Sequence, residues 1–327
     1  MPPMTAAPVD TALPVIDLSG LYGAPRDREN VAVAIGAACR GIGFFYVVGH
    51  RVPPDLIAQA FTTTAVFFSA PAAVKASAPF CPASNRGYIP FGREALDPDK
   101  PSDLKEAFNI GLDLAADDSE VLAGKPFRNP NVWPQLDGFR ETMLAYFDAV
   151  WTLGRDLHRA FATDLGIDPD FFRDKLDRPM ATLRVLHYPP RPASIAAGQL
   201  GAGEHTDYGN ITLLATDDVG GLEVRTRSGE WLQAPPVAGA FICNIGDCLM
   251  RWTNDVYVST PHRVASPAGR ERYSIAFFLD PNPDAVVSCI PTCSSAQRPP
   301  RYAAVTGADY LRSRLDPTYA SAAGSAM

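Results

Sequence analysis

The sequence is poor in the features that mark several large classes of protein. Its 327 residues include six cysteines, which lack the spacing of a zinc finger and have no partner histidines nearby. Reduced thiols in a cytoplasmic protein are therefore expected. No basic and then apolar leader opens the chain, so no signal peptide is predicted. No apolar run is long enough to span a membrane, so no membrane partner is expected.

Positive charge is also scarce and dispersed. The chain has 29 lysines and arginines against 36 acidic residues, which gives a net charge of -7. Proteins that bind nucleic acid concentrate their basic residues on one surface, and no such run is present. We therefore expect a small-molecule substrate and no nucleic acid partner. A monomer is the simplest oligomeric state to expect.

The hydrophobic pattern predicts helices first and mainly strands afterwards. Helical periodicity is found at 27–40, 56–68 and 138–165, with short strands at 13–18 and 43–48. After Pro179 the pattern changes to short strands separated by turns, at 181–188, 210–216, 220–225, 229–232, 240–245 and 272–279. Short strands framed by helices favour an α+β protein, mainly β, with a double-sheet jelly-roll core.

The most informative residues are His205 and Asp207. In an extended segment, side chains two residues apart share a face, so both can bind the same ion. His262 can supply a third ligand from a distant strand. Two histidines and one carboxylate on one side of a metal leave the other positions open, and this arrangement suits the Fe(II) of oxygenases. An ordinary surface pair is the alternative for His205 and Asp207.

Arg272 and Ser274 repeat the same spacing on a later strand. A guanidinium and a hydroxyl on one face can hold a carboxylate at two points. The alternative is a structural salt bridge between Arg272 and an acidic neighbour such as Asp280.

These motifs and their neighbours resemble the isopenicillin N synthase-like branch of the non-haem Fe(II)/2-oxoglutarate-dependent dioxygenases. The opening strands LPVIDL (13–18) and GFFYVVGH (43–50) are also similar to that family, so the resemblance covers nearly the whole chain. In the family's order, the later matches are LRVLHYPP (183–190), HTDYG (205–209), NIGD (244–247), WTN (252–254), STPHRV (259–264) and RYSI (272–275).

The resemblance implies a function and a set of cofactors. Fe(II) would be held by His205, Asp207 and His262, and 2-oxoglutarate by Arg272 and Ser274, with Tyr188 as a third partner. The family uses O2 and 2-oxoglutarate to hydroxylate, desaturate or cyclise a small molecule, with release of succinate and carbon dioxide.

The resemblance also implies a division of the chain. Residues 1–178 form an N-terminal region that packs on the barrel, 179–283 the catalytic core, and 284–327 a C-terminal segment with a lid and a disordered tail. One integrated unit is expected. Candidate substrate contacts are Arg86, Tyr88 and Phe91 in a long loop predicted at 70–101, together with Phe108 and Leu222, and surface packing is the alternative for the loop residues.

Other functions remain open at this stage. Many relatives have Asn two residues before the tyrosine, where this chain has Leu186, so a polar contact to the cosubstrate is absent. An Fe(II) oxidase that works without 2-oxoglutarate would use the same Arg-x-Ser pair, because isopenicillin N synthase holds its substrate's carboxylate with one. A non-catalytic metal-binding jelly roll and a zinc hydrolase are further alternatives.

Overall fold

The computed structural model describes residues 13–95, 100–191, 195, 198–265 and 269–324, with side chains described as far as Leu315. The leader at 1–12 and the last three residues of the tail lie outside these ranges. Among the described residues, no helix is both long and apolar enough to cross a membrane.

The larger of the two main sheets has eight strands in the order β1-β2-β10-β7-β12-β5-β4-β3. All neighbours in it are antiparallel except β1 and β2. Both edges of this sheet come from the N-terminal region, and its centre comes from the residues after Pro179. The strands are β1 (Val15–Asp17), β2 (Phe44–Val48), β3 (Gly87–Ile89), β4 (Glu106–Gly111), β5 (Thr182–Tyr188), β7 (Ile211–Thr216), β10 (Phe241–Ile245) and β12 (Arg272–Leu279).

The second sheet is smaller, with the order β6-β11-β8-β9, and it lies against one face of the first. Its strands are β6 (Ala202–His205), β8 (Leu222–Arg225), β9 (Trp231–Ala234) and β11 (His262–Val264). The two sheets form the predicted jelly roll, so the α+β expectation is confirmed. A third pairing joins β13 (Val286–Val287) to β14 (Val305–Thr306).

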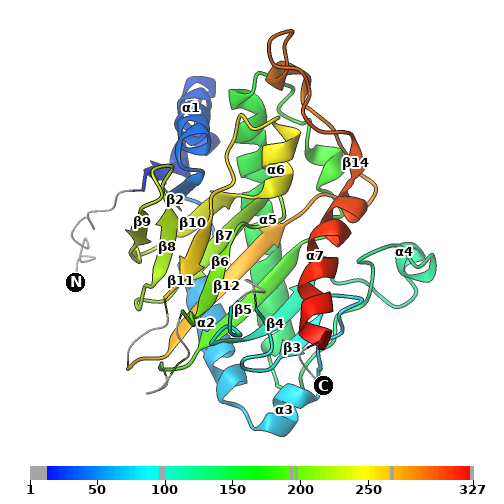
Figure 1. Cartoon of the computed structure of the whole chain (residues 1–327). Coiled ribbons are helices and arrows are strands. Elements are labelled where there is room, and N and C mark those ends of the chain that lie inside the picture. The colour runs from blue at the N-terminus through cyan, green and yellow to red at the C-terminus, as the bar shows by residue number, and fades with distance from the viewer. Residues whose placement is uncertain (1–12, 96–99, 192–194, 196–197, 266–268, 325–327) are drawn as a thin grey trace.

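Three long helices cover the outer face of the large sheet: α1 (Pro25–Gly41), α2 (Pro54–Ser69) and α5 (Phe139–Asp164). Helix α7 (Gly307–Gly324) lies on the opposite side of the sheet from α5 (Figure 1). It includes the first part of the tail that was expected to be disordered. The short helices are α3 (Ala72–Ala76), α4 (Ser119–Leu122), α6 (Asp247–Trp252) and the 3-10 turns η1 (Leu18–Tyr22), η2 (Arg173–Lys175) and η3 (Pro291–Cys293).

The pleat of the large sheet separates a helical core from a cavity. On β12, Ile275 and Phe277 belong to the core under the helices, whereas Ala276 belongs to the cluster between the two sheets. The same alternation places Val185 under the helices and Leu186 between the sheets. Alternating side chains of a strand point to opposite faces, so every second residue of these central strands faces the enclosed space.

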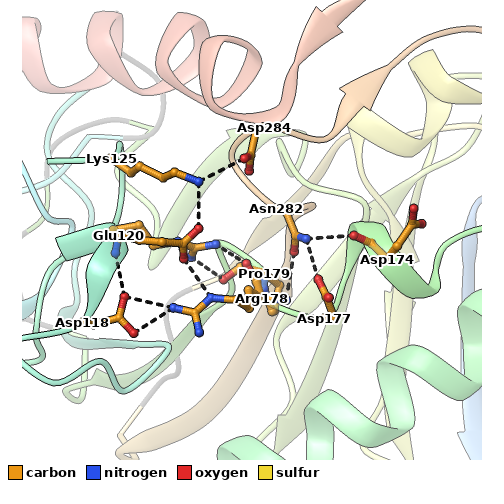
Figure 2. Close-up of polar contacts among 10 residues, drawn as sticks. Asp118, Glu120, Lys125, Asp174, Asp177, Arg178, Pro179, Asn282 and Asp284 are labelled. Carbon is orange, nitrogen blue, oxygen red and sulfur yellow. Dashed lines mark hydrogen bonds and ion pairs between the residues drawn. The ribbon is translucent and has the colours of Figure 1, made fainter. Parts of the chain in front are cut away.

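Polar contacts join the three parts of the chain at the predicted boundaries (Figure 2). Arg178 donates from Nε to Glu120 Oε2 at 2.8 Å, and from Nη2 to Asp118 Oδ2 at 2.9 Å. Lys125 bridges Glu120 and Asp284 at 3.0 and 3.1 Å. The loop around α4 is therefore attached to the residues on both sides of the core.

Asn282 completes this network from the end of the core. Its Oδ1 accepts from the backbone N–H of Arg178 at 3.0 Å, and its Nδ2 donates to Asp177 Oδ1 at 2.7 Å. Because the boundaries at 178/179 and 283/284 lie inside one network, the contacts support our proposal that the chain is one integrated unit.

Candidate metal centre and cosubstrate cavity

His205 and His262 are cross-strand partners at the end of the small sheet. They face each other in the β6–β11 register, and their ring centroids are 4.3 Å apart. Asp207 lies two residues beyond the end of β6, and its Oδ1 lies 3.7 Å from Nε2 of each histidine. One ligating atom from each residue lies within 4.8 Å of the others, and no fourth histidine, cysteine or acidic residue among the described ones joins them. The three predicted ligands are therefore brought together.

Backbone carbonyls orient both imidazoles. Nδ1 of His205 lies 2.8 Å from Gly203 O, and Nδ1 of His262 lies 3.1 Å from Thr260 O. A carbonyl can only accept, so Nδ1 carries the proton and Nε2 is left with a lone pair. Each Nε2 faces the space in front of Asp207, as in histidines that bind a metal.

The carboxylate of Asp207 is held by its other oxygen. Oδ2 accepts from Asn244 Nδ2 at 2.7 Å and from the Thr212 hydroxyl, so Oδ1 remains for a metal. Burial alone would raise the pKa of Asp207, but the two imidazoles and these hydrogen bonds hold it below its ordinary value. Burial and the neighbouring His262 lower the pKa of His205. Neutral imidazole and ionised carboxylate are the forms that bind a metal, so the residues fit Fe(II).

Arg272 lies fully buried on β12, 1% exposed. Its Nε donates to Gly220 O at 2.6 Å, its Nη1 lies 3.3 Å from Ser274 Oγ, and its guanidinium covers the Tyr188 ring at 4.6 Å. No carboxylate of the described residues forms an ion pair with it. A buried cation without a counter-charge is costly, so this site fits an anionic group such as a carboxylate of 2-oxoglutarate.

The alternative partner for Arg272, Asp280, is far away. The two residues lie on the same face of one extended segment, eight positions apart, which corresponds to roughly 27 Å along a strand. Both line the cavity between the sheets. The salt bridge considered from the sequence is therefore not formed.

The cavity extends between these two ends past the His-Asp-His group. Leu222, from the predicted set, lines it, as does Leu186 in place of the family's asparagine. Further lining residues come from the 85–109 region, from β5 and from α7: Asn85, Glu94, Lys105, Asn109, Thr182, Arg184, Leu311 and Leu315. The N-terminal region and the C-terminal segment thus both contribute to the walls, as expected.

Four candidate substrate residues do not line this cavity. The pleat turns Tyr88 and Phe108 toward the helices, where each packs against Phe67, with ring centroids 5.8 and 5.0 Å away. Arg86 is buried and packs its guanidinium against Gly111, while Phe91 is 43% exposed at the surface. Their positions do not support substrate contact, and we do not retain these four assignments.

Helical and strand structure interrupts the loop predicted at 70–101, which contains α3 and β3. Lys105 and Glu106, at the start of β4, are both buried and point to opposite faces. Lys105 pairs with Asp103 near the cavity, and Glu106 binds Lys75 at 3.0 Å behind the sheet.

Sequence reasoning missed the charged group near His205. Arg184 forms an ion pair with Glu94, and Lys105 lies 3.9 Å from the same carboxylate. The sequence could have revealed Arg184, because it lies two residues before Leu186 and four before Tyr188 and therefore shares their face of the strand. Glu94 comes from a loop, and loop residues carry no periodicity that would reveal their direction.

Helix α7 is attached to the strand that bears the ligands. Asp247, the first residue of α6, accepts from Thr206 Oγ1 at 3.1 Å and from Arg314 Nη2 at 2.6 Å. The Arg314 guanidinium also lies 5.1 Å from the Tyr208 ring centroid. Asp247 therefore supports the segment that carries the proposed ligands. Asn244 supports it as well, through its hydrogen bond to Asp207.

Two family models and a curated relative match most of the chain. Residues 13–136 match the family described as non-haem dioxygenase in morphine synthesis N-terminal, and residues 179–281 match the 2OG-Fe(II) oxygenase superfamily. A 2-oxoglutarate-Fe(II) type oxidoreductase of Emericella nidulans is 37% identical over 320 residues, covering 95% of this chain and 92% of the relative.

Solved structures agree with the sequence matches. A full-length Neurospora crassa protein, crystallised in complex with alpha-KG, has a TM-score of 0.84 and 36% identity, and the match covers 94% of this chain and 96% of that one. JOX2 in complex with 2OG, Fe and JA has a TM-score of 0.79 and 30% identity, over 97% and 91% of the two chains. The chain belongs to the 2OG-Fe(II) oxygenase superfamily, in its isopenicillin N synthase-like branch, and is a 2-oxoglutarate-dependent Fe(II) dioxygenase.

Proposed function

We propose that His205, Asp207 and His262 hold Fe(II), and that Arg272 and Ser274 hold the distal carboxylate of 2-oxoglutarate. The observation that carries this assignment is the pairing of a three-ligand cluster with a buried guanidinium that has no carboxylate partner in the described structure. Both open onto one cavity. Tyr188 is proposed as the third partner of this carboxylate, since it lines the same cavity and its ring lies 4.6 Å from the guanidinium.

The division of labour follows from these positions. When bound, Fe(II) and 2-oxoglutarate activate O2 for hydroxylation of the substrate, with formation of succinate and carbon dioxide. The protein's residues orient the reagents: Asn244 and Thr212 hold the Asp207 carboxylate, and Gly220 O fixes the Arg272 guanidinium. Leu186 and Tyr188 contribute apolar walls that exclude water, which strengthens the charge interactions inside.

The primary substrate is proposed to be a compact polar molecule. The cavity combines amide and charged groups from Asn85, Asn109 and Arg184 with the apolar side chains of Leu311 and Leu315. Buried polar groups of this kind select substrates that can satisfy their hydrogen bonds. The Neurospora crassa protein has also been crystallised with thymine, so small polar heterocycles belong in the first substrate panel.

The test has two stages. Anaerobic addition of 2-oxoglutarate to the Fe(II) protein should produce a visible charge-transfer band, and the band should be absent with His205→Ala. Succinate formation is then followed over amino acids, peptides, terpenoid acids, aromatic metabolites and thymine. No band with the wild-type protein would refute the cosubstrate assignment and favour an oxidase that works without 2-oxoglutarate.

We also propose a cytoplasmic location and a monomeric state. All six cysteines are free, which supports a reducing compartment. Size-exclusion chromatography with light scattering tests the oligomeric state, and fractionation of the producing cells tests the location.

A further inference from the structure

Asp280 is a buried carboxyl group that faces the cavity, and no residue of the described ranges pairs with it. It is 6% exposed and lines the cavity just beyond the end of β12. Within the described part of the chain, no hydrogen bond or ion pair reaches its oxygens. Its oxygens are accessible from the cavity, so a ligand bound there can supply the hydrogen bonds that the protein does not.

The surrounding backbone makes room for this carboxyl group. A Cβ atom on Gly209 would lie 2.6 Å from Asp280 Oδ1, so any side chain at 209 would collide with it. The carboxyl group is therefore held close to the segment that carries Asp207. Burial and the charge of Asp207 raise the pKa of Asp280 to about 7.

Other acidic groups at the cavity already have protein partners. Glu94 is paired with Arg184 and Lys105, and Asp207 has its hydrogen bonds and the two histidines. Asp280 differs because no described residue forms a hydrogen bond or an ion pair with its carboxyl group.

The charges of the loaded site lead to the same residue. Fe(II) and the 2-oxoglutarate dianion cancel, and Arg272 offsets Asp207. Lys105 and Arg184 offset Asp103 and Glu94. No neighbouring group offsets the negative charge of an ionised Asp280, so a substrate that carries a positive charge or an N–H can compensate for it.

We propose that Asp280 accepts a hydrogen bond from an N–H group of the primary substrate, which makes the preferred substrate a nitrogen compound such as an amine or an N–H heterocycle. This inference rests on the proposed function and names the substrate class of that site. Asp280 is a specificity residue, because it contacts the substrate and takes no part in holding iron or 2-oxoglutarate. A positively charged amine would compensate its charge fully, and a neutral N–H would satisfy its hydrogen bonding.

The test measures binding in the absence of O2, so that no turnover occurs. The protein is loaded with Fe(II) and 2-oxoglutarate, and calorimetry compares matched probes with and without the N–H group. The pairs are cyclohexylamine with cyclohexanol, and thymine with 1,3-dimethylthymine. The wild-type protein should bind at least one N–H member at least about tenfold more tightly than its partner, and Asp280→Ala, which has no side-chain oxygen to accept the N–H, should remove that preference. If the variant loses its preference only in the cyclohexylamine pair, the substrate is a charged amine. If it loses its preference in the thymine pair, the substrate is a neutral N–H compound.

Asp284→Ala provides the matched control, since Asp284 is a largely exposed acidic residue outside the cavity. It should leave both the probe preference and succinate formation unchanged. Asp280→Ser serves as a second variant, and a cooperative melt shows that each protein is folded. Equal binding of both members of each pair by the wild-type protein, or an intact preference in both Asp280 variants, would overturn the inference. A missing charge-transfer band with the wild-type protein would instead refute the proposed function.

Discussion

His205 and His262 are directly opposite each other on β6 and β11, although 57 positions separate them in the sequence. Because the pairing of two strands sets this relationship, the small sheet itself fixes the spacing of the two imidazoles. Two hydrogen bonds, from Asn244 and Thr212 to Oδ2, then fix the orientation of the Asp207 carboxylate. The site is therefore largely preorganised by the sheets.

Asn244→Ala should weaken Fe(II) binding by about 10- to 100-fold, because Asp207 Oδ2 loses one of its two donors. Fe(II) titration of the variant, followed by the charge-transfer band in the presence of 2-oxoglutarate, measures the effect. Thr206→Val is the control: Thr206 lies between two proposed ligands, yet its hydroxyl binds Asp247. Equal losses of affinity in the two variants would contradict the role given to Asn244.

Arg272→Ala should raise the dissociation constant of 2-oxoglutarate by at least about 30-fold, since truncating one side of a buried charge pair costs 2 kcal/mol or more. The affinity for Fe(II) should not change. Arg270→Ala is a suitable control, because Arg270 is exposed and pairs with Asp218 at the surface. If both dissociation constants rose together in Arg272→Ala, the residue would be acting on the fold and not on the cosubstrate.

His158 should make the protein less stable in weak acid. Burial lowers its pKa to about 4, and its Nδ1 binds Gly154 O at 2.7 Å while its Nε2 lies 3.2 Å from Asn210 Nδ2, as expected of a neutral ring. Between pH 6.5 and 4, the His158 imidazole is protonated in the unfolded chain and neutral in the folded chain. The free energy of unfolding should therefore fall as pH falls, by about 3 kcal/mol over the whole window.

The comparison of wild type with His158→Gln isolates this effect, because all other titrating groups are common to both. Urea unfolding of the metal-free proteins at several pH values gives the two profiles. The free energy of unfolding of the variant should fall less steeply between pH 6.5 and 4 than that of the wild type. Parallel profiles would show that His158 is not the cause of the pH dependence.

Arg128→Met should destabilise the fold by roughly 1 to 3 kcal/mol, because the carbonyls of Arg178 and Pro179 lose their donor while Glu120 keeps Lys125 and Arg178 as partners. Arg128 is 2% exposed, its Nε lies 3.0 Å from Glu120 Oε2, and its Nη1 donates to Pro179 O at 3.1 Å. Arg140→Met, at an exposed pair with Asp113, should cost no more than about 1 kcal/mol. Denaturant midpoints measure both, and similar small losses would mean that the Figure 2 network does not stabilise the fold.

The sequence was sufficient to bring together the proposed iron ligands and insufficient for most of the substrate end. His205 and Asp207 could be predicted because an i, i+2 spacing on a strand fixes which side chains share a face, whereas His262 came from the family resemblance and not from any local spacing. Phe108 was assigned to the cavity although it lies under the helices, because β4 is buried on both faces and its sequence does not reveal which face is which. Glu94 and Leu311 reach the cavity through tertiary packing that no local pattern records.

The arrangement of the large sheet has a consequence for the order of folding during synthesis. Strands β1 to β4 leave the ribosome first, yet β2 pairs with β10 and β4 with β5, which are made later. The nascent N-terminal region therefore carries strand edges with no neighbour until translation has passed residue 245. Unpaired edges invite association with other chains, so this protein should depend on chaperones or low temperature for good yield.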